Sequence, residues 1–342
     1  MHSNYIEVGI LLYPQAQLSA VLGLADLFSV ANRYLSQHTN TEYHQIRISH
    51  WQINKGRCCR VYDSEPQATH QALAVVIVPP SLAGLPNIED LQPYGDFLLE
   101  HHRQGAIMAS VCIGAYILAQ VGLLDGRQAT THWNYTAEFQ QRFAKVKWNT
   151  DKLLVDNGDI ITAGGVMAWT DLGLKLLDKL AGSSCMLSVA RTLLLDPPGR
   201  EQRLYSLFSP NLQHGDQAIL TVQHWLQEHA NTSFTVEHLA DKAGLQLRTF
   251  QRRFIKACGI NPLAYCQQLR VSKACELIQY SRLPIDNIAW QVGYQDSGAF
   301  RKIFHRVKGV SPAEYRRRFV ANDQPSLYLF NDEERDGVAA IN

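Results

Sequence analysis

The sequence predicts two domains of different fold class. The first is an α/β domain with a doubly wound, mostly parallel sheet, and the second is an all-α domain with two helix-turn-helix units. Apolar strand patterns alternate with amphipathic helical patterns over the first 195 residues, and a repeat runs through the last third. That third is also basic, because residues 216–320 contain 15 Lys or Arg and 8 Asp or Glu, against 17 and 23 in the rest of the chain.

The composition is that of a globular protein. The chain has 342 residues, 46% of them hydrophobic and 18% charged, which suits two or three domains. The longest apolar run, residues 72–78, is too short to cross a bilayer, and the first residues lack the pattern of a signal peptide. Seven cysteines without a paired spacing favour reduced thiols, and no zinc-ligand spacing occurs. We therefore expect a cytoplasmic protein with no membrane segment, no metal and no cofactor.

Five apolar segments predict the strands of the first domain, at residues 6–12, 46–51, 72–78, 106–111 and 159–164. Amphipathic helices are predicted over residues 19–35 and 90–103, and another helix is predicted after Gly164 and Gly165. The strands are almost continuously apolar, which is typical of a parallel sheet covered on both faces. In such a sheet, ligands bind at the carboxyl ends of the strands.

Cys112 lies at one of these strand ends. It follows the strand predicted at residues 106–111 and precedes a helical pattern, which is the layout of a nucleophile elbow with Ser110 in place of the first glycine. The backbone N–H groups that start the next helix could hold an anion or a carbonyl oxygen. His132 follows about twenty residues later and is a candidate base for the thiol.

The last third contains the repeat. With an offset of 49 or 50 residues, Val236, Leu239, Ala240, Gly244, Phe250, Phe254, Gly259, Pro262 and Tyr265 recur as Ile285, Ile288, Ala289, Gly293, Phe300, Phe304, Gly309, Pro312 and Tyr315. Each copy predicts a short helix, a turn at Gly244 or Gly293 where a left-handed residue is needed, and a second amphipathic helix. Asp296 is a good N-cap for the second helix of the second copy, whereas the first copy has Gln246 there.

The second helix of each copy is predicted to have a cationic outward face. Arg, Lys and Gln side chains hydrogen-bond base edges in the major groove, and small residues let a helix approach the duplex. The residues predicted to face bases are Arg248, Gln251, Arg252, Lys256, Ser297, Gly298, Arg301, Lys302 and His305. The residues expected to contact phosphates are Arg253, Arg306 and Lys308. The alternative is a helical bundle that binds another protein.

These motifs resemble the AraC/XylS family. The matching segments are IAWQVGYQDSGAFRKIF, the stretch GVSPAEYRRRF, and PLAYCQQLRVSKACELI between the two copies. The resemblance covers about residues 216–319 and implies seven helices, with one long helix that holds two DNA-reading helices for successive major grooves. It also implies a homodimer, double-stranded promoter or operator DNA and RNA polymerase as partners, and activation of transcription.

The first domain resembles the class I glutamine amidotransferase-like domain that is fused to AraC-family regulators, with its flavodoxin-like sheet. The resemblance covers about residues 5–196 and rests on YPQAQLSAVLGLADLF, ASVCIGAYILAQVGLLDGRQATTHW and ITAGGVMAWTDLGLKLLDKL. Ala20 stands where catalytic members carry an acid, and Pro79 and Pro80 stand where a glycine N–H completes the oxyanion hole. We therefore predict a non-catalytic binding domain. The alternative is a Cys-dependent hydrolase or amidotransferase-like enzyme that uses Cys112 and His132.

The predicted ligand pocket comprises Cys112, Ile113, His132, Trp133, Tyr13, Gly165 and Trp169. The resemblance implies a small nitrogen-containing effector, such as an amino-acid derivative or a quaternary amine, and tryptophans can cage such a cation. Each residue also has a structural alternative, because a buried Cys is commonly a small hydrophobe and a Trp can simply pack on a sheet.

The domain boundaries are predicted from composition. Residues 1–195 form the ligand-sensing domain, 196–215 a proline-rich and polar linker, 216–320 the DNA-binding domain, and 321–342 an acidic, flexible tail. The whole chain is thus predicted to be a transcription regulator. Effector binding to its first domain changes the relation of the two DNA-binding units of a dimer.

Overall fold

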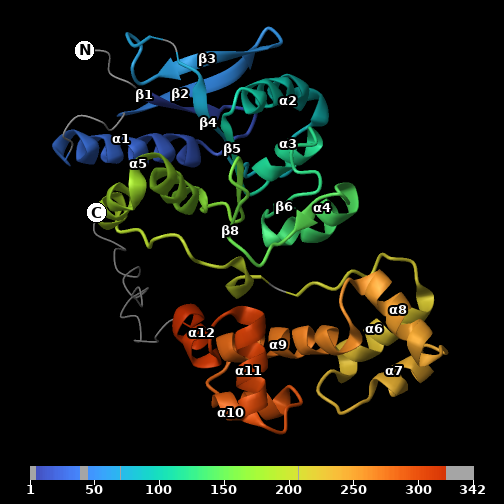
Figure 1. Ribbon diagram of the computed structural model, residues 1–342. Coiled ribbons are helices and arrows are strands. Elements are labelled where there is room, and N and C mark those ends of the chain that lie inside the picture. Colours follow the sequence, from blue (N-terminus) through green and yellow to red (C-terminus); the bar gives the residue numbers. More distant parts are fainter. Residues whose placement is uncertain (1–4, 39–44, 70, 207, 321–342) are drawn as a thin grey trace, which may run out of the picture. The chain divides into compact units, whose positions relative to one another are not determined.

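The chain divides into two units, residues 1–206 and 207–342, in the computed structural model (Figure 1). The structure describes residues 5–38, 45–69, 71–206 and 208–320, and each unit is considered by itself. Within these ranges, no helix is both long and apolar enough to cross a membrane. The acidic tail predicted at residues 321–342 lies outside the described residues.

The first unit is built on a mixed sheet. Its strands, in the order in which they lie side by side, are β3 (Arg57–Asp63), β2 (Gln45–Asn54), β1 (Tyr5–Leu11), β4 (Leu73–Val78), β5 (Ile107–Val111), β9 (Ile160–Ala163) and β8 (Leu154–Asp156). Neighbours are parallel except for the antiparallel pairs β2–β3 and β8–β9 at the two edges. All five predicted strands are present, and the predicted doubly wound, mostly parallel sheet is confirmed.

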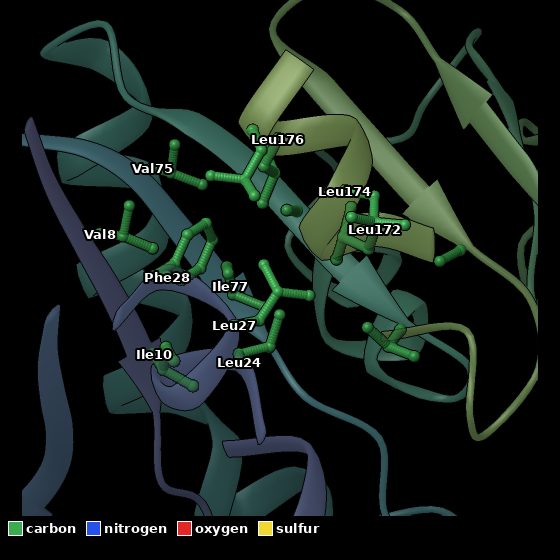
Figure 2. Packing of buried hydrophobic residues seen from close by; sticks show 14 of the residues in the cluster. Val8, Ile10, Leu24, Leu27, Phe28, Val75, Ile77, Leu172, Leu174 and Leu176 are labelled. Carbon is green, nitrogen blue, oxygen red and sulfur yellow. The ribbon is translucent and has the colours of Figure 1, made fainter. Parts of the chain in front are cut away.

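Helices cover both faces of this sheet because its central strands are apolar on both sides. On β4, Val75 and Ile77 point to one face and pack in a cluster with Phe28 (Figure 2). That face is covered by α1 (Leu18–His38) and α5 (Trp169–Leu193). Val76 and Val78 point to the opposite face, which is covered by α2 (Ile88–Arg103) and α3 (Gly114–Gln120).

Several short elements have no clear sequence pattern. They are β3, β8, the parallel pair β6 (Gln128–Ala129) and β7 (Lys147–Trp148), α4 (Thr136–Arg142), and the 3₁₀ helices Trp133–Tyr135 and Gln202–Leu204. β3 forms a hairpin with β2 through Lys55 and Gly56, whose φ angles of 50° and 76° suit a two-residue turn. Its side chains alternate between exposed and half-buried, so it lacks the apolar run of a central strand.

Two acidic and two basic side chains form an ion-pair network between β1, β2 and β3, in which Glu7 and Arg47 are buried and Arg60 and Asp63 are half-buried. Arg47 donates from Nε and Nη2 to the carboxylate of Asp63, at 2.8 and 2.5 Å, and holds the pKa of Asp63 down at about 2. Arg60 donates to Glu7 at 2.6 Å and to Asp63 at 2.8 Å. Glu7 and Arg47 are almost completely buried, so each charge needs its partners to offset the loss of water. The network fixes the β2–β3 hairpin on the sheet.

Seven helices are described in the second unit, as the resemblance implied. They are α6 (Gln217–His229), α7 (Val236–Lys242), α8 (Leu247–Cys258), α9 (Pro262–Tyr280), α10 (Ile285–Gln291), α11 (Ser297–Lys308) and α12 (Pro312–Phe319). Equivalent aromatic contacts recur in the two copies. The ring centroids of Phe254 and Tyr265 are 5.3 Å apart, and those of Phe304 and Tyr315 are 5.5 Å apart. The repeat in the sequence therefore corresponds to two hydrophobic cores with equivalent aromatic packing.

The linker predicted at residues 196–215 needs correction, because both of its ends are packed. Gln202 is 3% exposed, and Arg200 forms an ion pair with Asp171 of α5. Beyond the boundary, the rings of Phe208 and Tyr265 meet edge to face with centroids 5.1 Å apart. Residues 200–206 therefore belong to the first unit, and the second unit begins to pack at Phe208. Composition predicted an unpacked linker here because the stretch is rich in proline and polar residues.

Candidate nucleic-acid interface and elbow region

The second helix of each copy, α8 or α11, presents a cationic face to solvent. We call these two helices the recognition helices. Their phenylalanines lie at 0% exposure, which fixes the opposite face outward. The exposed residues are Arg248, Gln251, Arg252, Lys256, Gly298, Arg301, Lys302, His305 and Arg306, and Ser297 is half-buried. This exposure follows the helical spacing in the sequence, and contact of these side chains with DNA stays a prediction.

Two of the expected phosphate contacts are placed differently. Lys308 is 3% exposed and burial lowers its pKa, so its expected contact with DNA is wrong. Arg253 is half-buried and donates from Nε and Nη2 to the Asp216 carboxylate, at 2.8 and 2.6 Å. Asp216 also caps α6, so Arg253 joins α8 to α6. Arg306 is exposed and donates to Gln267 of α9 at 2.7 Å.

The two recognition helices begin differently, as the sequence predicted. The Asp296 carboxylate accepts hydrogen bonds from the backbone N–H groups of Gly298 at 3.1 Å and Ala299 at 2.8 Å. These bonds to the charged form hold the pKa of Asp296 below its ordinary value. Gln246 stands at the same place before α8 and makes no side-chain cap. The first recognition helix therefore starts with fewer of its backbone donors satisfied.

The long helix α9 separates the two recognition helices. In Figure 1, α6, α7 and α8 lie at one end of α9, and α10, α11 and α12 lie at the other. α9 contains 19 residues, which gives a length of about 28 Å at a rise of roughly 1.5 Å per residue. Neighbouring major grooves on one face of DNA are about 34 Å apart. The helix thus has the size needed to serve two such grooves.

Cys112 lies at the carboxyl end of β5 in the conformation of a nucleophile elbow. Its φ angle of 55° is in the left-handed region that non-glycine residues rarely adopt. Its backbone N–H donates to Ala163 O at 2.7 Å, and its carbonyl accepts from Thr131 Oγ1 at 2.9 Å. A Cβ at Gly114 would lie 2.6 Å from Val78 O, so this glycine lets α3 start close to β4. The backbone thus forms the elbow although the glycine motif is incomplete.

The surroundings of the Cys112 thiol oppose its ionisation. It is 1% exposed, and burial raises its pKa to about 12 against the opposing effect of the backbone N–H groups of Ile113 and His132. The His132 Nδ1 accepts from the Asn134 backbone N–H at 3.2 Å, and burial lowers the pKa of its imidazole. Ala20, which the family resemblance places where catalytic members carry an acid, is fully buried in α1. The thiol therefore stays protonated near neutral pH, and this imidazole nitrogen is not free to take its proton.

The other predicted pocket residues gather near the same strand ends and also take part in packing. Tyr13 is buried and donates to the backbone carbonyl of the first residue after β4, at 2.7 Å. Ile113 belongs to the apolar core, and Trp169 lies against α1. Trp133 and Gly165 are half-buried. The two tryptophans pack on different elements, which gives no support to a cage made of both.

Besides Ser110 Oγ on β5, two buried polar atoms in this region have no hydrogen-bond partner among the described residues. They are Gln17 Oε1, just before α1, and Trp169 Nε1, at the start of α5. The two segments are close, because Gln17 Nε2 lies 3.9 Å from Met167 Sδ. They provide one acceptor and one donor that a ligand can satisfy. In the same described ranges, no group of three or more His, Cys, Asp or Glu side chains could hold a metal ion.

Gln202 ties the loop beside Cys112 to the end of the first unit. Its Nε2 donates to Thr131 O at 2.8 Å and Lys152 O at 3.0 Å, and its Oε1 accepts from Trp133 N at 3.2 Å. A Cβ at Gly164 would overlap with the Gln202 side chain, so only glycine leaves room for it. The sequence gives no periodic pattern around Gln202, and the glycine pair after β9 is its one local signal.

Comparisons with known proteins agree with this division. A family model described as a helix-turn-helix domain matches residues 239–318, and a model of the DJ-1/PfpI family matches residues 37–179. The HTH-type transcriptional regulator ArgR of Pseudomonas aeruginosa is 29% identical over 63% of this chain and 66% of its own length. The regulator GbdR of Pseudomonas aeruginosa is 25% identical over 65% of this chain and 60% of its own length. The matches thus span less than two thirds of either relative.

Among solved structures, DJ-1beta of Drosophila melanogaster is 21% identical, with a TM-score of 0.43, over 56% of this chain and 98% of its own. The two family models define the class of protein, a helix-turn-helix protein with an N-terminal α/β domain. More narrowly, the chain is similar to AraC-family helix-turn-helix proteins whose N-terminal domain is of the DJ-1/PfpI, class I glutamine amidotransferase-like type. The family resemblance noted in the sequence is confirmed.

Proposed function

We propose that this protein is a sequence-specific DNA-binding transcription regulator. The observation that carries the proposal is the pair of exposed cationic faces on α8 and α11, at opposite ends of α9. Arginine and lysine bind guanine edges and phosphates, and the basic balance of residues 216–320 favours a polyanionic partner. Two relatives named as transcriptional regulators support the same function.

Selection of duplexes from a random pool by the full-length protein tests this proposal. We expect enrichment of a site with two half-sites about 10 base pairs apart. Binding to the selected duplex should weaken steeply with salt, because each neutralised phosphate releases counterions. A pool that shows no enrichment, as expected for a helical bundle that binds another protein, would contradict the proposal.

We propose that the first unit binds a small effector at the carboxyl ends of its parallel strands and has no catalytic role. The buried, protonated Cys112 argues against an enzyme. Gln17 Oε1 can accept from an ammonium group, and Trp169 Nε1 can donate to a carboxylate. An amino-acid derivative carries a group suited to each of these atoms, whereas a quaternary amine has no N–H to give to Gln17. We therefore favour the amino-acid derivative.

A thermal-shift screen of amino acids, their derivatives and quaternary amines on the full-length protein tests the effector class. A compound that binds only the native state raises the melting temperature as its concentration rises. Gln17→Leu should abolish the shift, and Cys112→Ser should retain it. Turnover of any compound that disappears in Cys112→Ser would instead support the hydrolase or amidotransferase alternative.

We further propose that the regulator acts in the cytoplasm as a homodimer and activates transcription through RNA polymerase, as the family resemblance implies. The oligomeric state is measured by light scattering of the full-length protein. Transcription from a promoter that carries the selected site, with purified RNA polymerase, gives the direction of regulation. A monomer at all concentrations, or repression, would contradict these points.

A further inference from the structure

Arg270 of α9 bonds both helix-turn-helix copies at once. Its Nε donates to Ala230 O at 2.6 Å and its Nη2 donates to Thr232 O at 2.9 Å, and both carbonyls lie in the connection between α6 and α7 of the first copy. Its Nη1 donates to Gly293 O at 3.1 Å, in the turn of the second copy. The guanidinium carbon lies 5.2 Å from the centroid of the Tyr294 ring.

The two copies also touch directly at this place. A Cβ at Gly293 would lie 2.8 Å from both the carbonyl carbon and the Cα of Asn231, closer than any real side chain approaches. The backbones of the second turn and of the α6–α7 connection are therefore in van der Waals contact. Gly293 has a φ angle of 92°, so two separate requirements select glycine at this position.

These contacts add a second connection between the copies. Without these contacts, α9 would be the covalent connection between the two copies, and a single long helix can bend. The Arg270 hydrogen bonds join α9 to the α6–α7 connection of the first copy and to the turn at Gly293 of the second copy, and the Gly293–Asn231 contact joins these two segments to each other. A guanidinium is suited to this task because its planar fork is charged and directs several donors at once, which an ammonium does not do.

We propose that Arg270 is a positioning residue that, together with the Gly293–Asn231 contact, fixes the orientation of the two recognition helices relative to each other. The inference rests on the proposed DNA-binding function and deepens it. A fixed relative orientation of the two recognition helices restricts the protein to half-sites at one spacing. Arg270 itself has no need to touch DNA, because its three donor atoms are directed at backbone carbonyls.

The repeat supplies a matched control. Gly244 occupies the equivalent turn of the first copy with a φ angle of 63°, and no heavy atom lies within 4 Å of a Cβ built there. Gly244→Ala and Gly293→Ala both place alanine in the left-handed region, which disfavours side chains. Only Gly293→Ala also pushes the Asn231 backbone away. The difference between the two variants therefore reports the contact between the copies.

Binding of full-length variants is measured on the duplex selected by the wild-type protein and on versions whose half-site spacing is changed by one or two base pairs. We expect Gly293→Ala and Arg270→Met to lose about tenfold or more in affinity at the original spacing, with a smaller penalty than wild type when the spacing changes. Arg270→Lys should fall between them, and Gly244→Ala should keep the spacing preference. Equal spacing preference in all variants would overturn the proposal.

Hydrogen exchange of the full-length protein without DNA tests whether Arg270 couples the two copies, separately from DNA binding. Arg270→Met should speed exchange together in the peptide that contains residues 230–232 and in the peptide that contains residues 293–295. Faster exchange in one peptide alone would contradict the proposal that Arg270 couples the two copies. If the wild-type protein selects no duplex, the proposed function fails, and this measurement still decides whether Arg270 couples the copies.

Discussion

The two helix-turn-helix copies share a core and differ on their surfaces. Phe254 and Tyr265 meet at nearly the same distance as Phe304 and Tyr315. The outward residues at corresponding positions differ, however. Arg248 of α8 corresponds to Gly298 of α11, and Gln251, Arg252 and Lys256 correspond to Arg301, Lys302 and Arg306. Packing retains the same buried aromatic residues in both copies, whereas the outward residues of the two copies differ. We therefore expect the copies to contribute equally to stability and to prefer different half-site sequences.

The largest effect expected is on the shared core. Phe254→Ala and Phe304→Ala each remove a fully buried ring and should each lower the free energy of unfolding by about 3–5 kcal/mol. Native-state hydrogen exchange of α8 and of α11 measures the two effects separately. Similar losses in the two copies would support equal contributions to stability, and losses that differ by more than about 2 kcal/mol would contradict them.

The next effect expected is on DNA binding. Arg252→Ala and Lys302→Ala should each weaken binding to the selected duplex by about tenfold, since one such contact contributes about 1–3 kcal/mol. Each should also relax the sequence preference in a different half-site. Lys273→Ala on α9 removes the same charge outside the recognition helices, and it should leave both preferences unchanged. Relaxation of one and the same half-site by Arg252→Ala and Lys302→Ala would argue against separate roles.

A smaller effect follows from the unequal helix starts. Gln246→Asp should give α8 the cap that α11 already has, and should raise the local stability of α8 by about 1 kcal/mol. The reverse change, Asp296→Gln, should lower the stability of α11. Hydrogen exchange near the start of each helix measures both. No gain from Gln246→Asp would mean that tertiary contacts already satisfy the first turn of α8.

The smallest effect expected is the pH dependence of the Asp296 cap of α11. Because the pKa of Asp296 is lowered in the folded protein, its cap stabilises α11 above the unfolded pKa and is lost as pH falls through the folded value. Carbon NMR of the carboxyl group should place its titration below 3.8, and the Gly298 and Ala299 amide shifts should follow it. Asp296→Asn should remove this titration. A midpoint above 3.8 would contradict the described cap.

Periodicity explains what the sequence predicts well. The five strands follow from short apolar runs, and the two helices of each copy and the outward placement of the cationic residues follow from spacings of three to four residues, whereas the full set of seven helices came from the family resemblance. Caps and turns add single positions, as Asp296 does for α11. The elbow at Cys112 was recognisable because a strand runs into a helix there, even with Ser110 in place of glycine.

Features that depend on partners far apart in the chain had no such signal. Arg47 and Glu7 lie in segments whose neighbours are apolar, and nothing local shows that Arg60 and Asp63 of an unpredicted edge strand neutralise them. Lys308 follows the buried Phe300 and Phe304 at intervals of four residues, so its spacing allowed burial, and its charge alone suggested an exposed residue. Gln202 lies in a proline-rich stretch that composition alone marks as free.

The short distance in sequence between Gln202 and Phe208 sets how motion can pass along the chain. Gln202 is bonded beside the elbow, Ser206 N donates to Gln202 O at 3.1 Å, and Phe208 is already packed in the second unit. Two residues span at most about 7 Å when fully extended. The chain between Ser206 and Phe208 is too short to accommodate a displacement of the Gln202 segment larger than this span. Such a displacement must either move Phe208 or disrupt the packing of Gln202 or Phe208.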